Sequence, residues 1–155
     1  MKQISLYTFL IILFASQALF AQNNMQAKRE QVKAQKAAFI TEKLNLTAVA
    51  AQKFWPIYNE YEAKREEISG RKRELMQKLT DNSGQLSEED YDKLGDEYID
   101  LNIKEVELEK VYHYKFKEAL TPSQILKLYQ AENQFKQFLI KQIRESQGNQ
   151  PKRRN

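Results

Sequence analysis

The stretch "LTPSQI", from Leu120 to Ile125, decides how this chain folds, because each of its residues suits the start of a helix. Thr121 stands at the N-cap position, and Pro122 occupies the first helical position, where the missing N–H of proline costs nothing. Gln124 follows the cap by three residues, so its side chain can reach back to the N–H of the cap. The leucine and isoleucine at the two ends bracket the cap as a hydrophobic staple. The stretch therefore predicts a helix start rather than a reactive or ligand-binding site.

A second, incomplete copy lies in "LNLTAVAAQKFWPIY", from Leu44 to Tyr58. Leu46 and Thr47 keep the staple and cap positions, but Ala50 stands where the glutamine would be. The second capping box therefore lacks its reciprocal side chain. Asn45 to Thr47 also match a glycosylation sequon, which we interpret as coincidental.

Composition indicates an all-α chain with little apolar surface per residue. Of 155 residues, 41% are hydrophobic and 30% charged, with only 4 glycines and 3 prolines, and the mean hydropathy is -0.74. Such a composition suits long helices and a thin, elongated assembly or a dimer rather than a thick core. The apolar spacing predicts four helices: residues 24–43, residues 48–79, a third that begins after the Ser87 cap, and residues 122–146.

Each predicted helix carries an apolar stripe, with turn-forming residues 80–87 between the second and third. The expected core residues are Val32, Phe39 and Ile40; Phe54, Ile57, Tyr61, Ile68, Leu75 and Leu79; Tyr91, Leu94, Tyr98, Leu101, Leu108, Tyr112 and Ala119; and Ile125, Leu128, Phe135, Leu139 and Ile143. Residues 88–109 hold ten acids and two lysines, whereas residues 64–74 are basic. These two segments should therefore attract each other when the chain folds back as a hairpin.

The ends of the chain are predicted to lie outside the helical domain, which we assign to residues 22–146. Residues 1–21 combine Lys2, a short apolar run and a cleavage position after Ala21, as a signal peptide does. An uncleaved membrane anchor is the alternative. Residues 147–155 form a predicted basic, disordered tail, whose three basic residues account for the +3 charge of the mature chain. A balanced body and a secretory signal argue against nucleic-acid binding.

Catalytic and metal-binding chemistry finds no support in the sequence. There is no cysteine and only one histidine, His113, so a zinc site or a di-iron helical site lacks its ligands. The acidic run lacks the spacing of a calcium loop. We therefore expect a non-enzyme without cofactor or metal.

Two "LT" helix starts behind a signal peptide, in a charged, cysteine-free helical chain, resemble the Spy/CpxP (LTxxQ-motif) family of periplasmic stress proteins. The segment "KFWPIYNEYEAKRE", from Lys53 to Glu66, resembles a subgroup labelled sensors of ECF-type sigma factors. The resemblance implies an elongated four-helix hairpin or cradle that forms an antiparallel homodimer in the periplasm. It also implies two activities: ATP-independent chaperoning of unfolded envelope proteins, or control of an envelope stress signal through a membrane-bound sensor or anti-sigma factor.

The aromatic segment around Pro56 admits two interpretations. Pro56 lies inside the second helix and should kink it. Trp55 and Tyr58, with Lys64 and Arg65 beside them, are candidates for a concave surface that binds clients or partners. In the alternative, the aromatic residues belong to the core and to dimer contacts. At the level of function, the alternative to a stress protein is a structural helical adaptor of an envelope assembly.

Overall fold

The computed structural model describes residues 25–82 and 84–148, and within them the chain is all-α without strands. The first helix covers residues 25–44, and the others are α2 (Ala48–Asp81), α3 (Glu88–Phe116) and α4 (Pro122–Gly148). The four predicted helices are confirmed, with helix starts and ends within about two residues of the expected positions. The predicted signal peptide lies outside the described residues. So does most of the predicted tail, although its first two residues continue α4.

Local side-chain and backbone chemistry explains where the helices begin and end. Asn45 adopts a φ of 47°, a left-handed conformation that terminates the first helix. The Thr47 hydroxyl then accepts a hydrogen bond from the Ala50 N–H at 3.2 Å, which starts α2. Ser87 is the predicted N-cap of α3, and with Asp90 it forms a reciprocal capping box. The hydrogen bonds from Ser87 hold the pKa of Asp90 below its usual value.

The described residues group into two compact units. The smaller unit contains residues 25–43 and 131–148. The rings of Phe39 and Phe135 pack there with centroids 5.7 Å apart, and Lys36 pairs with Glu132 at 3.7 Å. Phe39 and Phe135, each predicted as a core residue of its own helix, therefore pack against each other. Two residues predicted for this core, Val32 and Ile143, are instead exposed, and no described side chain buries them.

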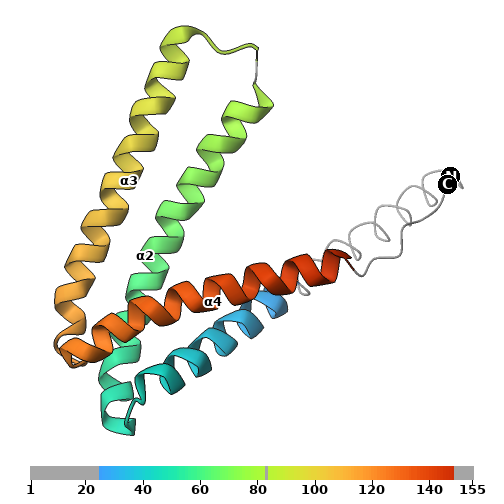
Figure 1. The fold of residues 1–155 in the computed structure, drawn as a ribbon. Coiled ribbons are helices and arrows are strands. Elements are labelled where there is room, and N and C mark those ends of the chain that lie inside the picture. The colour runs from blue at the N-terminus through green and yellow to red at the C-terminus, as the bar shows by residue number, and fades with distance from the viewer. Residues whose placement is uncertain (1–24, 83, 149–155) are drawn as a thin grey trace, which may run out of the picture. The chain divides into compact units, whose positions relative to one another are not determined.

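The larger unit, residues 44–130, is built on an antiparallel hairpin of α2 and α3, which run side by side in Figure 1. Its distal part is held by a small core of Leu75, Leu94 and Leu101, against which Ile68, Leu79 and Leu86 pack. Ion pairs join the basic part of α2 to the acidic part of α3, as expected: Arg71 with Glu97 at 2.8 Å, and Lys72 with Glu105.

Tyr91 and Tyr98, predicted for the core, are exposed. In a two-helix hairpin each helix meets only one neighbour, so a narrow strip at seven-residue spacing, such as Leu94 and Leu101, is covered. Side chains 40–60° away around the helix, as these tyrosines are at about 100° per residue, remain in contact with solvent. The narrow contact strip therefore explains why the apolar spacing predicted more core residues on α3 than the structure buries.

We expect Leu101→Ala to destabilise the hairpin by about 2–5 kcal/mol, because it removes a buried side chain from a three-residue core that has little else to fill the cavity. The matched control is Val111→Ala on the same helix, which removes a 52% exposed side chain and should cost less than about 0.5 kcal/mol. Urea unfolding followed by circular dichroism measures both. Equal losses for the two variants would contradict the assignment of Leu101 to the core.

Candidate functional site

The LTPSQ stretch forms the predicted capping box at the start of α4. The Thr121 N–H donates to Gln124 Oε1 at 3.0 Å, and the Gln124 N–H donates to Thr121 Oγ1 at 3.3 Å. Pro122 is the first residue of the helix. Leu120 and Ile125, the two staple residues, are both buried. The structural interpretation of this motif is thus confirmed in its geometry.

Gln124 also makes a contact that the sequence did not reveal. Its Nε2 donates a partly buried hydrogen bond of 3.0 Å to the backbone carbonyl oxygen of Leu44. Leu44 is the last residue of the first helix, and its carbonyl is one of the groups that a helix end leaves without an internal partner. One carboxamide therefore caps the start of α4 with its oxygen and the end of the first helix with its nitrogen.

The incomplete copy of the motif, at Leu46 and Thr47, follows Leu44 directly in the chain. Thr47 caps α2 by its hydroxyl alone, because Ala50 offers the N–H but no side chain to return the bond. Leu46, in the staple position, is partly buried. The hydrogen bond from Gln124 to the Leu44 carbonyl joins the two copies of the motif, because Leu44 begins the incomplete copy and Gln124 belongs to the complete one.

The aromatic segment of α2 forms the centre of the larger unit. Phe54, Tyr58 and Tyr61 from α2 pack against Tyr112 and Phe116 from α3, with ring centroids 5.3–6.2 Å apart across the helices. Of these, Phe116 was absent from the predicted core, because it lies off the seven-residue stripe that ends at Ala119. Phe116 is buried because it contacts the rings of Phe54, Tyr58 and Tyr61 on α2. Together these three rings cover a broader side of α3 than a single apolar stripe.

Two of the candidate binding residues, Trp55 and Tyr58, differ in their exposure. Tyr58 is only 3% exposed and contacts Phe54 and Phe116, so its assignment to an open binding surface is corrected: it is a core residue. Trp55 is partly buried and packs edge-on against Phe54 and Tyr58, with centroids at 4.9 and 5.4 Å. Part of the indole therefore remains open to solvent above the aromatic core.

The other two candidates, Lys64 and Arg65, are engaged in ion pairs along α2. Lys64 Nζ lies 2.9 Å from Glu60, and Arg65 lies 3.1 Å from Glu62 and 5.7 Å from the ring of Tyr61. Their charges are therefore partly compensated. The helix continues through Pro56, which lies on the exposed side. The kink predicted there stays a prediction.

A charged cluster covers Tyr112 at the edge of the aromatic core. The ammonium groups of Lys115 and Lys64 lie 4.5 and 5.6 Å from the centre of the Tyr112 ring, and both also pair with Glu60. The Tyr112 hydroxyl, Lys64 and Lys115 together lower the pKa of Glu60 to about 2. Glu60 is therefore ionised throughout the physiological range and holds two cations over one aromatic ring.

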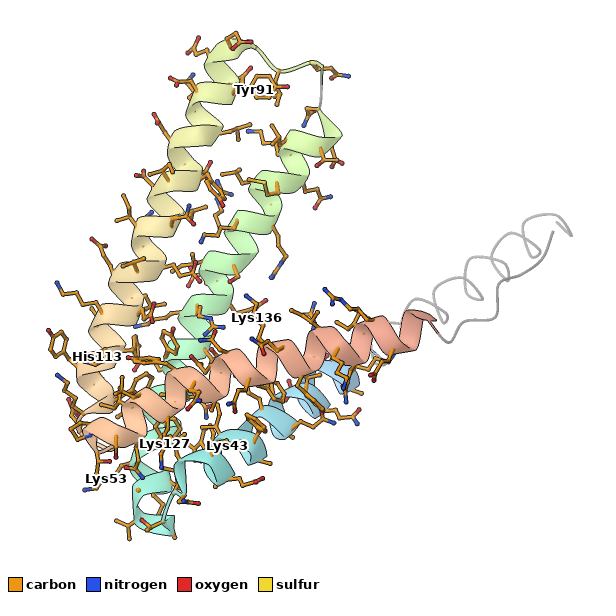
Figure 2. The ribbon with its side chains drawn as sticks, viewed as in Figure 1. Lys43, Lys53, Tyr91, His113, Lys127 and Lys136 are labelled. Carbon is orange, nitrogen blue, oxygen red and sulfur yellow. The ribbon has the colours of Figure 1, made fainter. Side chains whose placement is uncertain are left out.

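His113, the single histidine of the sequence, contacts α4. Its Nδ1 lies 2.8 Å from the hydroxyl of Tyr129 on α4, and the two rings stack at 19°. Figure 2 shows His113 near the C-terminal end of α3 and Tyr91 at the opposite end of that helix. In the part of the chain that the structure describes, no three His, Asp or Glu side chains gather as metal ligands do. Nor does any helix there have the length and apolar character that a membrane crossing requires.

Comparison with known proteins finds one family. A profile described as "LTXXQ motif family protein" matches residues 32–132, which include both copies of the motif and the whole α2–α3 hairpin. No curated protein and no solved structure matches the chain.

Gln124→Glu separates the two roles of this side chain. Glutamate is as good as glutamine in a capping box, but it cannot donate to the Leu44 carbonyl, and its carboxylate would face that oxygen. If the contact with Leu44 stabilises the fold, Gln124→Glu should cost about 1–3 kcal/mol, which is the penalty for an unsatisfied buried polar group. Thr121→Ala, the control, removes the cap and leaves the donor intact, for a loss of about 0.5–2 kcal/mol. Thermal unfolding of both variants measures the difference, and a Gln124→Glu protein as stable as the original would show that only capping matters.

Proposed function

Because the chain belongs to the LTXXQ motif family, we propose that it is a non-enzymatic stress protein of the periplasm that binds unfolded envelope proteins without ATP. The family match supports the general class of stress-related protein, and the surface of the described helices supports the binding role. The proposal rests on the exposed apolar side chains of that surface.

Large apolar side chains are exposed along every described helix instead of forming one compact patch. They include Met76, Ile99, Ile103, Val106, Tyr114, Leu126, Phe138 and Ile140. Charged residues stand between them and are frequently paired, as Lys93 is with Glu89. Scattered apolar contacts with charged surroundings suit weak binding of many different unfolded segments, which expose short apolar runs. A single enclosed pocket would instead suit one small ligand.

Control of an ECF sigma factor is the second function that we propose, and the resemblance of the Lys53–Glu66 segment favours it. In this segment the partly exposed Trp55 stands beside the exposed Lys53 and Pro56. A membrane-bound stress sensor or anti-sigma factor would then compete with unfolded proteins for the same helix. A structural adaptor without client binding is the remaining alternative.

An aggregation assay on residues 22–155 tests the chaperone proposal. The mature protein should suppress light scattering of a chemically denatured client on dilution, in the absence of nucleotide, at ratios from sub-stoichiometric to equimolar. An equal mass of a charged helical protein with few exposed apolar residues is the control. Unchanged scattering at a molar excess would favour the adaptor.

Trp55→Ala locates the binding surface. Because the indole is only partly buried, we expect a stability loss of about 1–3 kcal/mol, smaller than for a fully buried tryptophan. Client affinity, measured by fluorescence anisotropy on the folded fraction, should fall several-fold. Val49→Ala, on the same helix and more exposed, is the matched control and should leave affinity nearly unchanged. Equal losses for both variants would mean that binding is spread over α2 rather than centred on Trp55.

A further inference from the structure

The first helix and α4 run antiparallel to each other. Leu44, at the end of the first helix, accepts a hydrogen bond from Gln124 near the start of α4. Lys36, which comes earlier in the first helix, pairs with Glu132, which comes later in α4. The amino-terminal end of the first helix and the carboxyl-terminal end of α4 therefore lie together, as Figure 1 shows.

This shared end of the two helices, which we call the open end, is basic. It comprises residues 25–33 of the first helix and residues 136–146 of α4, and it contains six cations and only two acids. Residues 48–116, which include α2 and α3, contain eleven cations and sixteen acids. The described part of the chain therefore has an excess of positive charge at the open end and an excess of negative charge in the hairpin.

The few acids of the open end are already engaged in ion pairs on their own helices. Glu30 lies 3.0 Å from Lys33, and Glu145 lies 3.9 Å from Lys141. The other four cations of the open end form no ion pair with any residue that the structure describes; they are Lys28, Arg29, Lys136 and Arg144. These four charges are therefore available to an anionic partner.

On the first helix, exposed apolar side chains share a side with one of these cations. Met25 is 59% exposed, and Val32 is also exposed. At about 100° per residue, Met25, Arg29 and Val32 fall within about 60° of one another around the helix. One side of the first helix therefore presents apolar and basic groups together.

The end of α4 repeats this combination. Ile143 is 55% exposed, and Ile140 is also exposed. Lys136, Ile140 and Ile143 have the same spacing of four and three residues, so they too fall within about 60° of one another around the helix. Both helices of the open end therefore place an unpaired cation beside exposed apolar side chains.

An anionic lipid bilayer is the partner whose chemistry matches both kinds of group. Its phosphate groups attract lysine and arginine side chains. The boundary between its headgroups and acyl chains takes up the apolar side of a helix that lies on the surface. A small anion would match the cations alone, and it would leave the apolar side chains in water.

The ends of the chain favour a bilayer over a partner of defined shape. Residues 149–155 continue from α4 at the open end, and they add three further cations and no acid: Lys152, Arg153 and Arg154. A bilayer is an extended surface, so the two helix ends and the tail can meet it at the same time without a fitted pocket. The charge of the tail therefore adds to that of the described residues.

We propose that the open end binds to the surface of an anionic lipid bilayer. The unpaired cations of both helices contact lipid phosphate groups, and Met25 and Ile143 enter the boundary between headgroups and acyl chains. The excess of acids in residues 48–116 opposes adsorption of the hairpin to the same surface. This binding is independent of whether the protein also holds unfolded clients.

Co-sedimentation of the mature chain, residues 22–155, with lipid vesicles tests the proposal. Vesicles that contain phosphatidylglycerol should bind the protein, whereas vesicles of phosphatidylcholine alone should not. Binding should weaken when the ionic strength rises from about 0.1 M to about 1 M, because the screening length then falls from ~10 Å to ~3 Å. Equal binding to both kinds of vesicle, or no binding to the anionic ones, would overturn the proposal.

Arg29→Gln combined with Arg144→Gln removes one unpaired cation from each helix of the open end. Because each basic residue near an anionic surface strengthens binding about fivefold, vesicle affinity should fall by about 10- to 30-fold. The matched control is Lys104→Gln combined with Lys110→Gln, which removes the same charge from exposed positions of α3 and should leave affinity nearly unchanged. Circular dichroism should show the same helix content for both double variants.

Three outcomes of this comparison would contradict the proposal. An equal loss for the two double variants would show that only net charge matters. Unchanged vesicle affinity of the arginine variant would show that the tail alone binds. If the arginine variant kept its vesicle affinity and instead lost affinity for an acidic unfolded client, the open end would be a client site.

A fluorescent label shows which part of the protein enters the bilayer. Because the chain contains no cysteine, Ile143→Cys provides a single site for an environment-sensitive fluorophore. Its emission should shift to shorter wavelength on binding to the anionic vesicles, since the label enters a less polar region. Val111→Cys on α3, where the native side chain is similarly exposed, is the matched control and should show no shift. A shift at position 111 alone, or at neither position, would overturn the proposal.

Discussion

The carboxamide of Gln124 is the interaction on which the arrangement of the larger unit depends. Its oxygen accepts from Thr121 at the start of α4, while its nitrogen donates to the last carbonyl of the first helix at Leu44. Helix ends are where backbone groups lack partners, and leaving them unsatisfied in a partly buried place costs more than a hydrogen bond gains. Because the Gln124 carboxamide has both a donor and an acceptor, it satisfies one backbone group at each of two helix ends. Serine, threonine or glutamate in its place would satisfy at most one of them.

The α2–α3 hairpin shows how a chain of low hydropathy distributes its few apolar residues. Near the connection, the two helices are held by three buried leucines and by ion pairs such as Arg71 with Glu97. Toward the other end, the aromatic cluster around Phe116 replaces them. Each exposed ion pair contributes little, about 0.2–1 kcal/mol. Together with the narrow apolar strips they determine which sides of the two helices face each other.

The same narrow packing links the fold to the proposed functions. A helix that has only one neighbour leaves most of its circumference in contact with solvent, so apolar residues beyond the contact strip remain available for other molecules. Leu126 and Phe138 on α4, for example, are exposed, and scattered apolar side chains of this kind suit weak and unspecific contacts with many clients.

Much of the fold could be read from the sequence, because helix starts depend on neighbouring residues. Ser87 with Asp90, and Thr121 with Gln124, form the capping boxes that their three-residue spacing predicts, and the charge contrast between residues 64–74 and 88–109 indicated the hairpin. The sequence placed Leu101 and Tyr112 in the core, since they keep the seven-residue spacing that a neighbouring helix covers.

Tertiary structure alone decided which apolar residues are covered and by what. Tyr58 lies in the core and Tyr98 is exposed, although both are tyrosines within long helices of the same hairpin. Burial depends on how wide the neighbouring surface is, and that width comes from residues distant in the chain, such as Phe116 beside α2. The bond from Gln124 to Leu44 spans 80 positions, so no local spacing could predict it. Local chemistry therefore determined the helices of this protein, whereas contacts between distant segments determined its core and the side chains left open for partners.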